Sequence, residues 1–300
     1  MGCTYANGAG YRFTYGDWGI INKIESLSST GVTRNYVSYN YPLASAGPLT
    51  DAPAYTQQTV SPDGLDTNTS VWNYAVTKSG TGIVTSMAVS DPLGTTTTTN
   101  LDQFSGMTSS VQTKDSSNTV LRTVNYTWSP GLPLPGTITT TLNDTGQQSS
   151  IQYAYDQMSN VGNPTDVYEY DFGMVLKRHT VTTYQNGTNL NYRILTLPTR
   201  VVVKDGAGNI ISRTDMAYDG GTLVSVTGDG NHDDINYGAS FTVRGNLTSV
   251  TRYANAAAGT GAVTRNFAYD TLGNLRTADL DCCNSKTFNF SSSTHYAYPD

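Results

Sequence analysis

Residues 266–276 read Asn-Phe-Ala-Tyr-Asp-Thr-Leu-Gly-Asn-Leu-Arg. Phe267 and Tyr269 are two residues apart, so both side chains point to one face of an extended strand. Asp270 and Gly273 stand at the two ends of a four-residue turn. An Asp at the first position accepts hydrogen bonds from backbone N–H groups, and a Gly at the fourth tolerates the left-handed conformation. The stretch therefore predicts a β-hairpin whose register is fixed by its turn.

Parts of this pattern recur along the chain, as Tyr-Asp pairs, Asp–Gly turns and Gly-Asn pairs. The repeat residues are Tyr155, Asp156, Tyr170, Asp171, Gly173, Asp205, Gly208, Asn209, Tyr218, Asp219, Gly245, Asn246, Tyr269, Asp270, Gly273, Asn274 and Leu275. After Asp156, Ser159-Asn160 stands where Gly-Asn is expected, and residues 244–247 reproduce only the exit half of the unit. Spacings range from fifteen residues between Asp156 and Asp171 to twenty-eight between Asn246 and Asn274. The pattern predicts an irregular array of hairpins.

The Tyr-Asp-x-x-Gly-Asn-Leu core at residues 269–275 resembles the repeat of the bacterial Rhs, or YD-repeat, proteins, whose relatives include the shell regions of Tc toxins and the teneurins. A weaker similarity extends from about Tyr153 to the end of the sequence, with departures at Ser159 and Phe172. The resemblance implies a long β-sheet spiral that can close into a hollow shell around another polypeptide.

The composition favours strands over helices. Tyr contributes 21 residues against 7 Phe, which suits sheet surfaces that are partly in contact with water. Glu and Lys, on which helices depend, are scarce: Glu25 and Glu169 are the only two Glu in the sequence. We expect an all-β fold, an irregular array of antiparallel β-hairpins that forms a YD-repeat-like β-spiral or shell segment. Aromatic and aliphatic residues are expected on one face, with Thr, Ser and Asn on the other.

Pro130, Pro133 and Pro135 mark the best internal break. It divides the chain into an irregular N-terminal β-meander, residues 1–136, and a YD-repeat-like hairpin array, residues 137–300. Residues 51–65 contain two prolines, so any strand there should be short or lie at an edge. The other expected strands are residues 11–15, 20–27, 32–41, 71–78, 83–90, 95–101, 108–114, 119–128, 137–142, 150–155, 166–170, 175–184, 192–204, 210–218, 223–227, 247–253, 263–269, 275–280 and 286–290.

The charge pattern argues against nucleic-acid binding and membrane insertion. The formal net charge is -6, and the acidity comes mostly from Asp in turns, which is a structural use. Arg residues are scattered singly, whereas a phosphate-binding surface needs clustered cations. No window has the length and apolarity of a membrane span.

The sharpest metal candidates are Asp229, Asn231 and Asp233, whose oxygen atoms occupy every second position of one loop. An EF-hand loop requires Gly where Asp234 stands and Glu where Ser240 stands. A solvated loop tip is therefore favoured, and we expect no metal and no cofactor.

Motifs for catalysis are missing from the sequence. It contains no Gly-x-Ser-x-Gly and no His-Glu-x-x-His, and the only histidines are His179, His232 and His295. Residues 91–94 read Asp-Pro-Leu-Gly, a type I turn with Pro at its second position, to which we assign no protease role. We expect no enzymatic activity.

Cys3 and the adjacent pair Cys282-Cys283 have neither a redox nor a zinc-binding spacing, so their role stays open. The first residues lack the apolar run of a signal peptide. We interpret the chain as a fragment of a secreted or cell-surface protein whose export signal lies outside it.

Two functions follow as hypotheses. In the first, the chain is a non-catalytic structural segment of a large Rhs-like protein, part of a β-shell that encloses or presents a C-terminal effector. Its partners are then the remaining repeats and the effector of the same polypeptide. In the second, it is a carbohydrate-binding or adhesion module whose exposed aromatic residues stack on glycans, with Trp18, Trp72 and Trp128 as first candidates.

Overall fold

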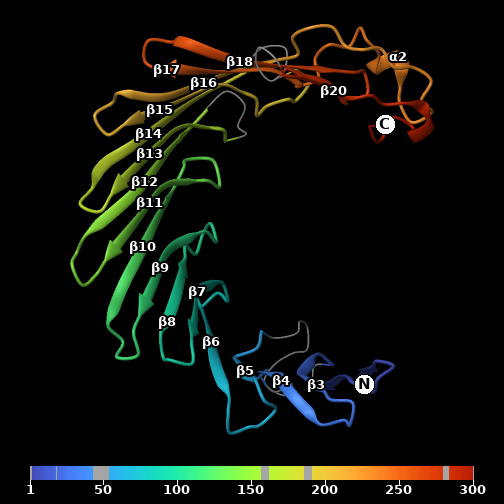
Figure 1. The fold of residues 1–300 in the computed structure, drawn as a ribbon. Helices are drawn as coiled ribbons and strands as arrows, with labels where there is room; N and C mark the ends of the chain where they lie inside the picture. The colour runs from blue at the N-terminus through green and yellow to red at the C-terminus, as the bar shows by residue number, and fades with distance from the viewer. Residues whose placement is uncertain are drawn as a thin grey trace. The chain divides into compact units, whose positions relative to one another are not determined.

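The structure is a computed structural model of the chain, and it describes residues 2–17, 19–42, 54–156, 162–185, 191–279 and 284–299. Antiparallel strands dominate these residues, and consecutive strands lie side by side (Figure 1). Helix is scarce in the described part, and its named segments are the short α2 (Asp234–Tyr237) and the 3-10 turn η2 (Ser292–Thr294). The all-β fold expected from the sequence is confirmed.

The chain divides into two compact units, one formed by Met1–Tyr126 and Thr140–Gln147, the other by Thr127–Thr139 and Gln148–Asp300. The strands of the first unit are β1 (Gly2–Thr4), β2 (Gly10–Tyr15), β3 (Ile21–Leu27), β4 (Thr33–Asn40), β5 (Gln57–Ser61), β6 (Ser70–Lys78), β7 (Val84–Ser90), β8 (Thr96–Leu101) and β9 (Thr108–Lys114). β10 (Val120–Trp128) and β11 (Pro135–Leu142) contain residues of both units. From β1 to β10 each strand pairs antiparallel with the next.

The second unit continues the same plan. Its strands are β12 (Gln148–Tyr155), β13 (Pro164–Asp171), β14 (Val175–Tyr184), β15 (Pro198–Asp205), β16 (Ile210–Tyr218), β17 (Leu247–Asn255), β18 (Thr260–Tyr269), β19 (Leu275–Asp279) and β20 (Ser285–Thr287). Each again pairs antiparallel with its successor. The expected division of the chain at residue 136 stays a prediction.

Most expected strands form within one or two residues of the expected bounds, but two expectations were wrong. The strand expected over residues 192–204 begins only at Pro198. Residues 223–227 form no strand: Val224 makes a single parallel bridge with Asp270. β5 is short, as expected, but it pairs with both β4 and β6 and is therefore not an edge strand.

Each strand is covered mainly by its two neighbours in the sheet, and little of the chain is fully buried. Among described residues, the buried apolar side chains are Tyr36, Val124, Val226, Ala256 and Ala278. The expected separation of an aromatic face from a polar face is incomplete. Tyr153 pairs with Val167, whereas Tyr168 pairs with Gln152, so these two tyrosines lie on opposite faces. A sheet without a second layer has no dry face that would force such a separation.

Candidate functional site

The best-formed turn of the repeat is the one expected at residues 270–274. Asp270 is fully buried, and its Oδ1 accepts hydrogen bonds from the backbone N–H groups of Leu272 at 3.0 Å and Asn274 at 2.9 Å. The Asn274 side-chain amide donates to Asp270 Oδ2 at 3.2 Å. Gly273 has φ +88°, the left-handed conformation that suits glycine. One carboxylate therefore organises the whole reversal, and we call this arrangement a Tyr-Asp turn.

Asp205 makes the same set of contacts between β15 and β16. Its Oδ1 accepts from the N–H groups of Ala207 at 2.9 Å and Asn209 at 2.8 Å, and Gly208 has φ +89°. The hydrogen bond from the Asn209 side chain is the largest of the causes that lower the pKa of Asp205. Asp171 differs from Asp270 and Asp205. Among the described residues, its carboxylate accepts one backbone hydrogen bond, from the N–H of Phe172 at 2.8 Å.

The turn after Tyr218 is built from two segments that are far apart in the sequence. Asp219 Oδ1 accepts from the N–H of Asn246 at 2.9 Å, and its Oδ2 accepts from Gly245 at 2.9 Å and Arg244 at 3.1 Å. The backbone N–H of Asp219 donates to the Asn246 carbonyl at 2.8 Å, as that of Asp270 does to Asn274 at 3.0 Å. Tyr218 and residues 244–247, expected as parts of separate units, thus form one turn with residues 220–243 inserted.

The turn at Asp156 is likewise built from two segments that are not adjacent in the sequence. Its backbone N–H donates to the Asn163 carbonyl at 2.9 Å, and the Asn163 side chain donates to Asp156 Oδ2 at 2.9 Å. Gly162 has φ +80°. The glycine and asparagine of this turn are therefore Gly162 and Asn163. Ser159-Asn160, the pair expected to serve, lies outside the described residues.

A second recurring contact ties tyrosines at strand ends to prolines. The hydroxyl of Tyr155 donates to the carbonyl of Pro135 at 2.8 Å, that of Tyr184 to Pro164 at 3.2 Å, and that of Tyr218 to Pro198 at 3.0 Å. Each pair is separated by 20 residues, and each proline is the first residue of its strand. A proline suits that position because it has no N–H to donate to a neighbouring strand.

These tyrosine–proline bonds were missed from the sequence, although the constant spacing was visible there. Burial raises the pKa of all three tyrosines. The hydroxyls are therefore held against the strand ends rather than in water. The contact fixes the end of one strand to the beginning of the strand before it.

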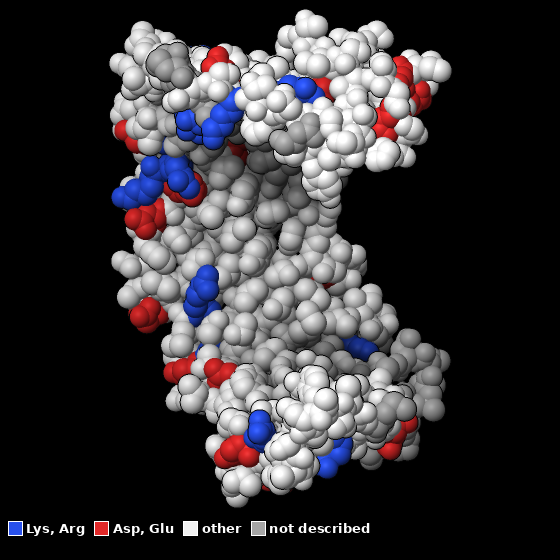
Figure 2. Space-filling model, turned by 45° about the vertical axis from the view of Figure 1, so that its right-hand side comes forward, with Lys and Arg blue, Asp and Glu red and all other residues white. Residues whose placement is uncertain are grey.

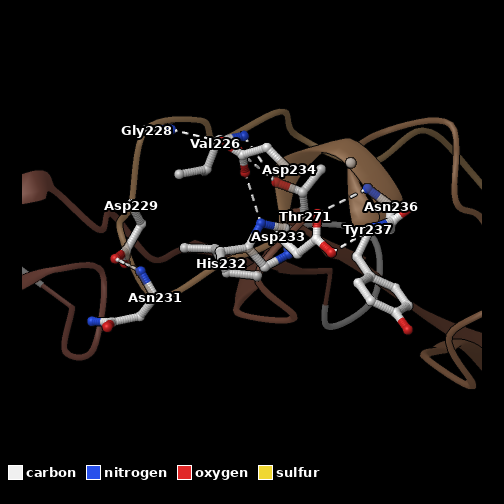
Figure 3. Close-up of polar contacts among 12 residues, drawn as sticks. Val226, Gly228, Asp229, Asn231, His232, Asp233, Asp234, Asn236, Tyr237 and Thr271 are labelled. Carbon is white, nitrogen blue, oxygen red and sulfur yellow. Dashed lines mark hydrogen bonds and ion pairs between the residues drawn. The ribbon is translucent and has the colours of Figure 1, made fainter.

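The insertion between Gly220 and Arg244 contacts the Asp270 turn, and Figure 3 shows Val226 of the insertion beside Thr271. Thr271 is fully buried, and its hydroxyl accepts from the N–H of Val226 at 3.0 Å and donates to the Val226 carbonyl at 2.9 Å. Arg244 donates to the carbonyls of Thr271 at 2.7 Å and Phe241 at 2.8 Å. The region expected as a strand at residues 223–227 is thus a cover segment, held by the single backbone bridge at Val224 and by the side chains of Thr271 and Arg244.

Two of the three metal candidates, Asp229 and Asp233, use carboxylate oxygens in hydrogen bonds inside the insertion. Asp229 Oδ1 accepts from the N–H of Asn231 at 3.0 Å, whereas Asp233 accepts from the N–H of Asn236 at 3.1 Å and caps α2 (Figure 3). No group of three or more His, Cys, Asp or Glu side chains that could hold a metal ion occurs in the part of the chain that the structure describes. The carboxylates of Asp229 and Asp233 thus bond to backbone groups at different places in the insertion.

The histidines lie in separate places. His179 Nε2 lies 2.8 Å from Asp166 Oδ1, and its ring stacks on Tyr168 with centroids 4.0 Å apart. His232 Nδ1 lies 2.7 Å from Asp234 Oδ1 in the insertion. His295 is the cap of η2. Each is explained by local packing or capping.

The other singled-out residues divide between described and undescribed parts. Trp72 and Trp128 are half-buried in β6 and β10, and Cys3 is an exposed free cysteine. Trp18, Cys282 and Cys283 lie outside the described residues. Residues 91–94 form the expected turn, with the N–H of Gly94 donating to the Asp91 carbonyl at 3.0 Å. Among the described residues, no helix is long and apolar enough to span a membrane.

No family model and no curated protein sequence matches the chain. Solved structures that match the chain weakly include a porin-like protein from Bacteroides uniformis ATCC 8492, 14% identical over 85% of this chain and 86% of its own, with a TM-score of 0.31. A chain in the crystal structure of TcdB2-TccC3-TEV is 12% identical over 93% of this chain and 15% of its own, with a TM-score of 0.27.

A chain of the Photorhabdus luminescens Tc holotoxin pore is 12% identical, with 93% of this chain and 18% of its own covered, at a TM-score of 0.21. This chain thus spans less than a fifth of either toxin chain. At TM-scores this low the similarities do not identify a function.

Proposed function

We propose that this chain is a non-catalytic structural segment of a larger secreted or cell-surface protein of the Rhs or YD-repeat type. Its sheet forms part of a β-shell that encloses or presents a C-terminal effector of the same polypeptide. The partners of the segment are the remaining repeats and that effector.

The observation that carries the proposal is the repetition of one Asp-centred turn along the sheet, three times at the same end of the strands. The turns at Asp156, Asp219 and Asp270 connect β12 to β13, β16 to β17 and β18 to β19. Because strand direction alternates, these three connections lie at the same end of the strands. The turns tolerate insertions of different lengths without losing their hydrogen bonds. Such an array can be extended by further units, since each unit is covered by its neighbours.

The proposal is tested on the gene and then on the protein. We expect the coding sequence on either side to contain further Tyr-Asp turns, followed by a C-terminal tail of unrelated composition. Co-expression of the repeat region with that tail should protect the tail from added protease, whereas the tail expressed alone should be cleaved. Flanking sequence without such turns, or a tail equally protected alone, would contradict the proposal.

A second candidate function is glycan binding. Tyr192 and Tyr237 are 51% and 49% exposed, and both rings stand edge-on against Phe241, with centroids 5.3 and 5.1 Å away. They line a hollow of about 410 Å³, and half-exposed tyrosine rings suit stacking on sugars. A glycan array separates the two functions: Tyr237→Ala should abolish binding, and Tyr298→Ala should not. An array without signal leaves only the structural function.

A further inference from the structure

The face of the sheet that contains Phe267 has an unusual distribution of charge. Arg252 pairs with Val263, and Arg265 pairs with Val250, so all four side chains lie on one face of β17 and β18. Phe267 follows on the same face, two residues after Arg265. These five residues line a hollow of about 230 Å³. The hollow combines an apolar floor with two cationic groups.

Arg252 and Arg265 have no acidic partner among the described residues. Neither forms an ion pair in the part of the chain that the structure describes, although Arg12, Arg178, Arg200, Arg213 and Arg276 all do. Arg252 and Arg265 are diagonal neighbours on adjacent strands, a relationship that places Cβ atoms about 7–8 Å apart. Like charges at this distance repel each other, and an anion between them would attract both.

The acidic residues of the neighbouring strands lie on the opposite face. Asp215 pairs with Thr251 and accepts a hydrogen bond from Tyr253 at 2.8 Å, and Asp279 pairs with Asn266. Lys286 lies on the Phe267 side, because it pairs with Ala278, which in turn pairs with Phe267. The charged strand residues on this face of β17 to β20 are therefore basic, in a chain whose net charge is -6. In Figure 2, Lys and Arg side chains lie next to Asp and Glu side chains at several places on the face that is drawn.

We propose that the hollow formed by Val250, Arg252, Val263, Arg265 and Phe267 binds an acidic polypeptide segment that has apolar side chains between its carboxylates. The carboxylates would accept from the guanidinium groups, and the apolar side chains would cover Val263, which is 46% exposed. A nucleic acid fits less well, since two arginines and one lysine track few phosphates and phosphate contacts make no use of valines. The inference rests on the proposed shell function, in which the wall holds another polypeptide.

The test is fluorescence anisotropy with labelled synthetic peptides and the whole chain. The probe consists of four Glu-Leu-Gly repeats, and the comparison peptides replace every Glu by Gln or every Leu by Ser. We expect the probe to bind, both comparison peptides to bind at least about tenfold more weakly, and added salt to weaken binding. No binding of the probe, or equal binding of either comparison peptide, would overturn the proposal.

A matched pair of variants locates the site. The double variant Arg252→Ala, Arg265→Ala should lose at least about tenfold in affinity for the probe, whereas Arg34→Ala, Arg122→Ala, which removes the same charge from exposed positions of the first unit, should change it by less than about twofold. Circular dichroism establishes that each variant is folded, and Val263→Ser serves as a milder second variant. Equal losses from both double variants would show a net-charge effect and reject the site. Failure here leaves the shell proposal intact, because that proposal is tested on flanking sequence and protection of the tail.

Discussion

The hydroxyl of Tyr218 donates to the carbonyl oxygen of Pro198 at 3.0 Å, across the hairpin formed by β15 and β16. The same bond joins Tyr155 to Pro135 and Tyr184 to Pro164, in each case over 20 residues. A sheet without a second layer can be stabilised only along its strands and at its ends. These bonds stabilise the ends.

Replacing one of these tyrosines by phenylalanine should remove the bond and little else. We expect Tyr218→Phe to lower the free energy of unfolding by about 1 kcal/mol, the usual net contribution of such a hydrogen bond. Urea denaturation followed by circular dichroism measures it. Tyr298→Phe is the control, because Tyr298 is 71% exposed. Equal effects of the two variants would mean that the Pro198 contact contributes nothing.

The conformation of Gly273 can be tested separately from its packing. A Cβ at Gly273 would meet no atom within 4 Å, but the residue has φ +88°. Gly273→Ala should therefore cost about 1–2 kcal/mol through backbone strain alone. Gly80→Ala, at a turn glycine without positive φ and equally free of neighbours, should be nearly neutral in thermal denaturation. A neutral Gly273→Ala would show that the turn relaxes.

Asp219 and residues 244–247 form a complete turn although residues 220–243 lie between them. We therefore expect that the inserted residues are not needed for β16 to pair with β17. Replacing residues 220–244 by Thr-Leu places Asp219 and Gly245 at the spacing of Asp270 and Gly273. Hydrogen exchange should then show β16 and β17 still protected, with faster exchange at Thr271, whose cover is gone. Adding Asp219→Ala to the shortened chain should lose protection at the turn. Loss of β16–β17 protection in the shortened chain itself would refute the equivalence of the turns.

Stability should depend on pH through Glu25, whose pKa falls to about 2, chiefly because Arg12 hydrogen-bonds it. A carboxyl with a lowered pKa in the folded state stabilises the fold when ionised. This contribution is fully present above the ordinary pKa of 4.5 and is lost as the pH falls toward 2. Urea midpoints of the parent should therefore exceed those of Glu25→Gln at pH 6, and the difference should shrink below pH 4. A difference independent of pH would contradict the ion pair.

The hydrogen bonds within the Asp270 and Asp205 turns could be predicted from the sequence, because the donor and acceptor residues are close in the chain. Asp270 and Asp205 each hold backbone groups two and four residues ahead, and a strand period of two fixes which side chains share a face. The strand ends that adjoin these two turns were expected within one residue. The cover segment at residues 223–227 misled the prediction because its apolar residues look like a strand, whereas they pack over the buried Thr271.

The sequence alone therefore determined that the chain makes antiparallel hairpins and which aspartates and glycines reverse it. Only the tertiary structure decided which two segments form one turn, such as Asp219 with Gly245. It also decided which proline carbonyls accept the hydrogen bonds of the tyrosine hydroxyls. The physical reason is that the entropy of closing a loop grows only slowly with its length. A turn can thus accept a long insertion at small additional cost, and its two halves need not be neighbours in the sequence.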